Sequence, residues 1–169
     1  MPTIEAISTT YLEADTASVT FSSIPATYEH LQLRVSSKSS AAGSHDNNRL
    51  RFNSDAGSNY VWHYMYGYGS AVAAAAYVAQ SSALIPWHAA ANESTVYGAS
   101  VVDILDYRNT NKNTTVSVLT GLTLSTNWTS LMSCLWLSTA AVTSITITPY
   151  GASNLVRGSE FTLYGLKSS

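Results

Sequence analysis

The feature that most constrains this chain is a strict two-residue alternation over residues 60–67. Every second residue there is aromatic, and in an extended strand these side chains all point to one face. The aromatic residues are Tyr60, Trp62, Tyr64 and Tyr66. An alternation of this period predicts a β-strand with two different faces.

A second strand is predicted just before the aromatic one. In residues 49–53, Leu50 and Phe52 alternate with polar neighbours, which is typical of a half-buried strand. Residues 54–59 (SDAGSN) then supply the side chains that favour tight turns, since Asp and Asn bond to nearby backbone and Gly accepts positive φ. We therefore expect residues 49–67 to form a β-hairpin at the centre of the fold.

The same pattern predicts strands along the rest of the chain, at residues 3–8, 17–22, 30–36, 96–107, 114–120, 131–137, 142–148 and 160–166. Residues 84–87 are expected to form a buried return segment. Residues 37–48 are expected to be a polar loop, too hydrophilic for the core. The alanine-rich residues 70–80 favour either a short helix or an edge strand, because alanine has high helix propensity but the segment has no amphipathic stripe.

These segments predict eight to ten strands with short polar connections and no amphipathic helix of useful length. Without helices to cover the sheet faces, two sheets must pack on each other. The expected fold is all-β: an antiparallel two-sheet sandwich, jelly-roll-like, with at most one short helix. The 169 residues fit a single domain, 1–169.

Composition narrows the possible partners. The chain has 8 basic and 10 acidic residues, so there is no positive surface to favour nucleic acid. No apolar stretch approaches the about 20 residues that cross a bilayer, so no membrane partner is expected. Only 11% of the residues are charged, against about 25% in an average protein. A surface poor in charge favours a role inside an assembly.

Five stretches, in order, resemble a family of virion proteins of tailed bacteriophages, of the type found in cyanophages and other marine and freshwater phages. They are residues 19–33 (VTFSSIPATYEHLQL), 49–60 (RLRFNSDAGSNY), 97–107 (YGASVVDILDY), 135–148 (LWLSTAAVTSITIT) and 161–167 (FTLYGLK). Together they span most of the chain. The chain departs from the family pattern in residues 70–80 and 86–88.

The resemblance implies a jelly-roll module of the phage particle. The leading expectation is a capsid decoration, or cement, protein on the outer surface of the head. It would bridge subunits of the major capsid protein of the same phage, and the family favours a homotrimer. The alternative is a tail fibre or baseplate module that binds a host-surface glycan through exposed aromatic side chains. A third hypothesis, an enzyme that cleaves polysaccharide, requires two carboxylates that converge in a groove.

The residues themselves give little support to an enzyme. Asp103 and Asp106 are an i, i+3 pair, and on one strand such residues point to opposite faces unless a bulge intervenes. The four histidines show no metal-ligand spacing, and the lone Cys134 is expected to be an inert buried thiol. We therefore expect no catalytic residues, cofactor or metal.

The candidate site is instead a surface for contact between subunits. We assign it to the aromatic face and to the turn before it: Tyr60, Trp62, Tyr64, Tyr66, Asp55 and Asn59. Tyr and Trp suit both a core and an interface, because each combines a large apolar area with a polar atom. Four aromatic side chains on one face are too many for one sugar-binding platform.

Overall fold

The computed structural model describes residues 3–123 and 127–167 of the chain, and in these residues it has twelve β-strands and no helix. The strands are β1 (Thr3–Tyr11), β2 (Val19–Phe21), β3 (His30–Ser37), β4 (His45–Phe52), β5 (Tyr60–Tyr68), β6 (Ala71–Gln80), β7 (Ala83–Ala89), β8 (Gly98–Leu105), β9 (Thr114–Leu122), β10 (Trp128–Trp136), β11 (Ile145–Pro149) and β12 (Glu160–Lys167). The all-β prediction is confirmed, with more strands than the eight to ten expected.

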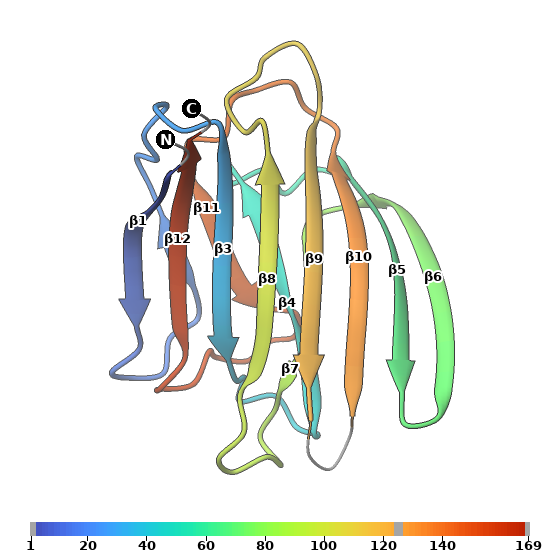
Figure 1. Ribbon diagram of the computed structural model, residues 1–169. Helices are drawn as coiled ribbons and strands as arrows, with labels where there is room; N and C mark the ends of the chain where they lie inside the picture. The colour runs from blue at the N-terminus through green and yellow to red at the C-terminus, as the bar shows by residue number, and fades with distance from the viewer. Residues whose placement is uncertain (1–2, 124–126, 168–169) are drawn as a thin grey trace.

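The strands form two antiparallel sheets packed as a sandwich (Figure 1). The large sheet has eight strands in the order β1-β12-β3-β8-β9-β10-β5-β6, and the small sheet has four in the order β2-β11-β4-β7. Four antiparallel pairs are nested along the chain: β1 with β12, β2 with β11, β3 with β8, and β4 with β7. Successive pairs alternate between the sheets, which is the connectivity of an eight-stranded jelly roll.

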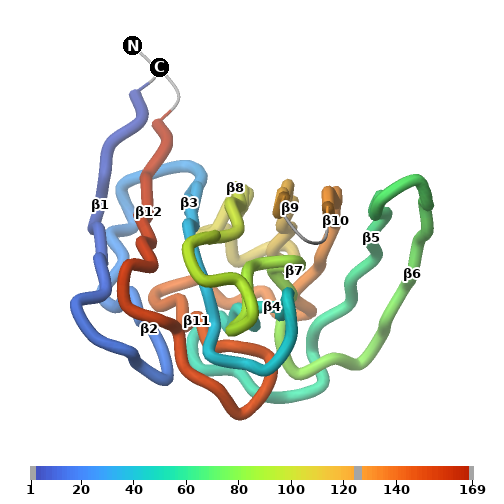
Figure 2. The backbone as a smooth tube through the Cα atoms, turned by 90° about the horizontal axis from the view of Figure 1, so that it is seen from below, coloured from blue at the N-terminus to red at the C-terminus, as the bar shows by residue number. Residues whose placement is uncertain are grey.

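Two further strand pairs extend this jelly roll. The segment between β4 and β7 adds β5 and β6, and the segment between β8 and β11 adds β9 and β10. All four join the large sheet beyond β8, so the large sheet is wider than the small one. In Figure 2, β5 and β6 extend past the small sheet, and β6 forms the far edge.

The core lies between the sheets. Alternate residues of each strand point inward, as in β10, where every second side chain is buried. Fully buried members include Leu33 of β3, Phe52 of β4, Ile104 of β8 and Ile147 of β11, so both sheets contribute. Burial of one such side chain is worth about 1.5–3 kcal/mol.

The expected hairpin over residues 49–67 is wrong, although both of its strands are present. β4 pairs with β11 and β7 in the small sheet, whereas β5 pairs with β10 and β6 in the large one. The turn at residues 54–59 therefore carries the chain from one sheet to the other. As a result, the aromatic rings of Phe52 and Tyr60 meet across the sandwich, with centroids 6.4 Å apart.

The polar loop expected at residues 37–48 is also wrong in part. β4 already begins at His45, and several polar residues before it are buried. Their hydrogen bonds explain why this is tolerated. Asn48 Nδ2 donates to Ser37 Oγ at 2.9 Å, and the Lys38 ammonium donates to the backbone carbonyls of Glu93 and Ser94.

The alanine-rich segment is the edge strand β6, one of its two predicted alternatives. Its register with β5 explains this outcome. Tyr77 pairs with Trp62, and their rings lie 4.2 Å apart. The Tyr77 ring also stacks on Tyr64, so these two aromatic contacts support the strand while most of its alanines stay exposed. A pairing partner thus overrides the helix propensity of alanine.

Candidate functional site

The first half of β5 belongs to the core. Tyr60 is completely buried, and Trp62 is buried as well. The Tyr60 hydroxyl accepts a hydrogen bond from the backbone N–H of Phe52 at 3.0 Å and donates to the carbonyl of Asp55 at 3.4 Å. Tyr60 also stacks on Trp136. Tyr60 and Trp62, both assigned to the predicted interface, therefore contact the same chain and leave almost no surface for a partner.

Asp55 organises the turn that precedes β5. Its carboxylate accepts hydrogen bonds from the backbone N–H of Gly57 at 2.8 Å, from Asn59 Nδ2 at 2.9 Å, and from Trp136 Nε1 at 2.7 Å. These donors, with the Trp136 indole first, hold the pKa of Asp55 below its ordinary value. Asp55 and Asn59 thus lie together as predicted, and they fix the turn to the end of β10.

The second half of β5 lies at the margin of the core. Tyr64 and Tyr66 are partly buried and pack against Trp87 of β7, with ring centroids 6.3 and 5.4 Å from it. Trp87 stacks on Trp128 of β10 at 4.0 Å. We call the side chains at this end of the sandwich the aromatic cluster: His45, Tyr64, Tyr66, Tyr68, Trp87 and Trp128.

Several polar atoms in and beside the aromatic cluster are buried without a hydrogen-bond partner. They are Nε1 of Trp62, Trp87 and Trp128, and both ring nitrogens of His88. Such groups cost stability, since they have lost water and gained nothing in return. Burial lowers the pKa of His45, and it lowers the pKa of His88 to about 3.

The outer face of the large sheet carries an unexpected apolar row. Leu119 of β9, Leu131 of β10 and Met65 of β5 are direct cross-strand neighbours, and each is more than half exposed (56%, 51% and 52%). Val101 of β8 and Ala74 of β6 continue the row on either side. Because large exposed apolar patches are rare on monomers, this row is a candidate contact surface.

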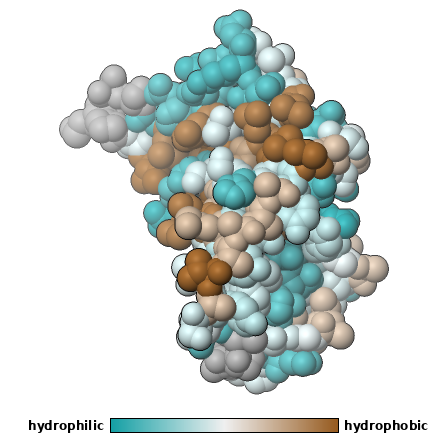
Figure 3. Space-filling view, turned by 90° about the vertical axis from the view of Figure 1, so that its right-hand side faces the viewer, coloured by the Kyte–Doolittle hydropathy of each residue, from teal (hydrophilic) through white to brown (hydrophobic). Residues whose placement is uncertain are grey.

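The outer face is almost free of charge between β8 and β6. Among Asp, Glu, Lys and Arg, the described residues of these strands include Asp103 of β8 alone, and it accepts a hydrogen bond from Gln32 Nε2 at 2.8 Å. His63 of β5 lies on the same face and is exposed. Figure 3 views the molecule from its β6 side, where hydrophobic atoms lie exposed among more polar ones.

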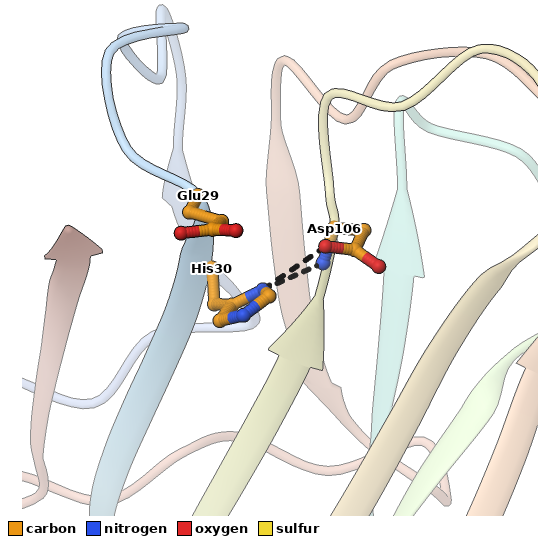
Figure 4. Close-up of side chains that lie close together, drawn as sticks. All are labelled: Glu29, His30 and Asp106. Atoms are coloured by element: carbon orange, nitrogen blue, oxygen red, sulfur yellow. Dashed lines mark hydrogen bonds and ion pairs between the residues drawn. The ribbon is translucent and has the colours of Figure 1, made fainter. Parts of the chain in front are cut away.

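A small polar cluster lies where β3 begins and β8 ends. Atoms of Glu29, His30 and Asp106 lie within 4.8 Å of one another (Figure 4). His30 Nδ1 accepts a hydrogen bond from the backbone N–H of Asp106 at 2.9 Å, and the Lys112 ammonium pairs with the Asp106 carboxylate. The hydrogen bond from Lys112 holds the pKa of Asp106 below its ordinary value, the opposite of what a general acid needs.

The two carboxylates weighed for the enzyme hypothesis, Asp103 and Asp106, lie in different surroundings. Asp103 lies on the outer face of the large sheet, whereas Asp106 follows the end of β8 with a positive φ of 50°. Cys134 is buried, and burial raises the pKa of its thiol to about 12, as expected for an unreactive core residue.

Sequence reasoning therefore located the aromatic strand and its turn but missed Trp87, Trp128 and the apolar row. The sequence did carry a signal for the apolar row. Leu119 and Leu131 are apolar, yet they stand at the alternate positions of their strands that point away from the core. Trp87 had no such signal, since its ring contacts come from β4, β5 and β10, which are remote from it in the sequence.

A comparison of the chain with models of protein families, with curated proteins and with solved structures found no match in any of the three. Among the described residues, no helix is long and apolar enough to cross a membrane.

Proposed function

We propose that this chain is a non-enzymatic structural protein of a virus particle. More specifically, we propose a capsid decoration protein of a tailed phage, located on the outer surface of the head and bridging subunits of the major capsid protein. Two features support the proposal: the ordered resemblance described above and the jelly-roll topology. The observation that carries it is the broad, nearly uncharged outer face with its exposed apolar row.

The apolar row suits contact with a large protein surface. Leu119, Leu131 and Met65 lie side by side on three neighbouring strands, so a partner of matching shape removes all three from water together. A protein that binds only the assembled shell stabilises that shell over its dissociated subunits by mass action. The proposed role is therefore mechanical and requires no catalytic group.

The test is binding to expanded capsids that lack the protein. The wild-type chain should sediment with such capsids and raise the temperature at which they break open. Leu131→Lys places a charge at the centre of the row and should abolish binding, whereas Ser22→Lys, exposed at the end of β2 in the small sheet, should bind normally. Wild-type protein that fails to sediment with the capsids would refute the proposal. Normal binding by Leu131→Lys would exclude the outer face.

The number of chains in each bound unit can be measured on the same capsids. The resemblance favours a homotrimer, which would suit local three-fold positions of a capsid lattice. Chemical cross-linking of the capsid-bound chain should then give a species of three chains.

The aromatic cluster favours a second function, a tail fibre or baseplate module that binds a host-surface glycan. Tyr68 is 49% exposed and stacks on Trp128, with ring centroids 4.6 Å apart, so one ring face is supported from behind. Sugars stack on such rings. Specific binding on a glycan array, lost in Tyr68→Ala and kept in Tyr150→Ala, would favour this function over capsid decoration.

A further inference from the structure

The strand edges of the sandwich differ in how they are protected. An edge strand presents unpaired backbone N–H and C=O groups, and proteins protect such edges with charges, proline, bulges, short strands or covering segments. β2 has only three residues. β7 contains Pro86 and is largely buried. β1 has a bulge between Ala6 and Ser8 and carries Glu5, which bonds to Tyr28 and Lys167.

β6 lacks these devices over most of its length. Within the described residues it pairs with β5 alone, and its ten residues include no charge and no proline. Its register irregularity lies at one end, after Tyr77, where Ala79 has a φ of 53°. Val72 and Val78 are 78% and 69% exposed. A long, uncharged edge of this kind is suited to pairing with another strand.

The side chains of β6 are also self-complementary. Val72, Ala74 and Ala76 pair with β5 residues of the outer face, and Val78, two residues further on, is exposed as well. Read in either direction, this face is Val-Ala-Ala-Val. Two antiparallel copies related by a two-fold axis at Ala75 therefore place Val72 opposite Val78 of the second copy.

The inner face fits the same register. There Tyr77 falls opposite Ala73 of the second copy, so a large side chain meets a small one at both ends of the contact, and Ala75 meets its own equivalent. An isologous two-fold contact requires this kind of self-matching, and a strand that has it on both faces favours a copy of itself over an unrelated partner.

We propose that β6 pairs in antiparallel fashion with β6 of a second copy of this chain, so that the two large sheets become one continuous sheet. The pairing uses the strand edge and leaves the apolar row of each chain exposed on the same side of the dimer. It does not depend on the proposed function. It is also distinct from the three-fold arrangement that the resemblance favours, which would need a different surface.

The test uses cysteine cross-linking of the full chain. Residues directly opposite in an antiparallel pair have Cα atoms about 4.5–5.5 Å apart, within the range of a disulfide. Under oxidation, Ala75→Cys should give a covalent dimer. Ala73→Cys is the matched control: it lies on the same face, but in this register the two copies of residue 73 are about 13 Å apart, so it should stay monomeric. The native Cys134 is buried and should not react.

A second measurement follows association in solution. Sedimentation of the wild type should show a concentration-dependent dimer, and Ala75→Lys, which places two like charges opposite each other, should weaken dimerisation about tenfold or more. Thr115→Lys, exposed on the outer face of β9 and away from the edge, should leave it unchanged. A monomeric wild type, equal cross-linking of both cysteine variants, or a trimer insensitive to Ala75→Lys would each overturn the proposal.

Discussion

The two ends of β5 carry the same kind of side chain but have different surroundings. At the Tyr60 end, the hydroxyl of Tyr60 and the indole of Trp136 both find hydrogen-bond partners in the Asp55 turn. At the Tyr66 end, the indoles of Trp87 and Trp128 stack closely, but their N–H groups have no partner. The polar atoms of Tyr60 and Trp136 are therefore satisfied, whereas the buried indole N–H groups of Trp62, in mid-strand, and of Trp87 and Trp128 are not.

The difference arises from where the small sheet ends. β4 leads directly into the turn at the Tyr60 end, so backbone and carboxylate groups are available there. At the Tyr66 end, β7 and the start of β4 lie beneath the large sheet, and they contribute the rings of Trp87 and His45. A single alternating strand, β5, thus supplies buried core residues at one end and a partly open aromatic surface at the other.

The largest expected effect comes from truncating one aromatic residue at each end. Tyr60→Ala should lower the free energy of unfolding by about 3–5 kcal/mol, because it leaves a cavity in the core and removes two hydrogen bonds. Tyr66→Ala should cost about 1–2 kcal/mol, since this side chain is only partly buried. Urea unfolding of both variants measures the difference, and equal losses would show that the two ends of β5 are alike.

The next effect is a loss of folding stability at acid pH. Buried His88 is held neutral in the folded state with a pKa of about 3, against 6.5 when unfolded, although Asp46 Oδ2 lies 3.9 Å from its Nε2. Between these values the unfolded chain binds more protons, so stability must fall as the pH falls. From pH 6.5 to about pH 4.5 His88 should account for a loss of about 2 kcal/mol.

Unfolding curves measured at several pH values test this effect. The loss should be smaller by that amount in His88→Leu, which has no titrating group at this position. His63→Gln is the control, because His63 is exposed on the outer face. The same pH dependence in His88→Leu as in the wild type would show that His88 is not the cause.

The smallest effect isolates one hydrogen bond. Trp136→Phe and Trp128→Phe remove the same atoms from buried indoles, but only Trp136 Nε1 has a partner, the Asp55 carboxylate. Trp136→Phe should therefore cost about 1–2 kcal/mol more than Trp128→Phe in urea unfolding at pH 7. Because the pKa of Asp55 is lowered in the folded state, its contribution is present above its ordinary pKa and is lost as the pH falls below it. A larger cost for Trp128→Phe would contradict the hydrogen-bond assignment.

The sequence by itself determined most of the strands and the alternation of their two faces. A two-residue period acts locally, since neighbouring side chains on a strand always point to opposite faces. For this reason Leu50 and Phe52 could be assigned to one face of a half-buried strand, and the aromatic residues of β5 to a common face, before any partner strand was known. That Tyr60 and Trp62 lie in the interior, and not at the subunit contact expected for them, came from the structure alone. The Asp55 turn was predictable on similar grounds, because Asp, Gly and Asn act within a few residues of themselves.

Only the tertiary structure decided which strands pair. The period of β4 and β5 is the same whether they form a hairpin or lie in opposite sheets, and their true partners, β11 and β10, are remote in the sequence. Long-range pairing also decided the fate of the polar residues 37–48, of the alanine-rich β6, and of Trp87 beside Trp128. Side-chain direction is set by the local backbone, whereas strand partners are set by the packing of the whole chain.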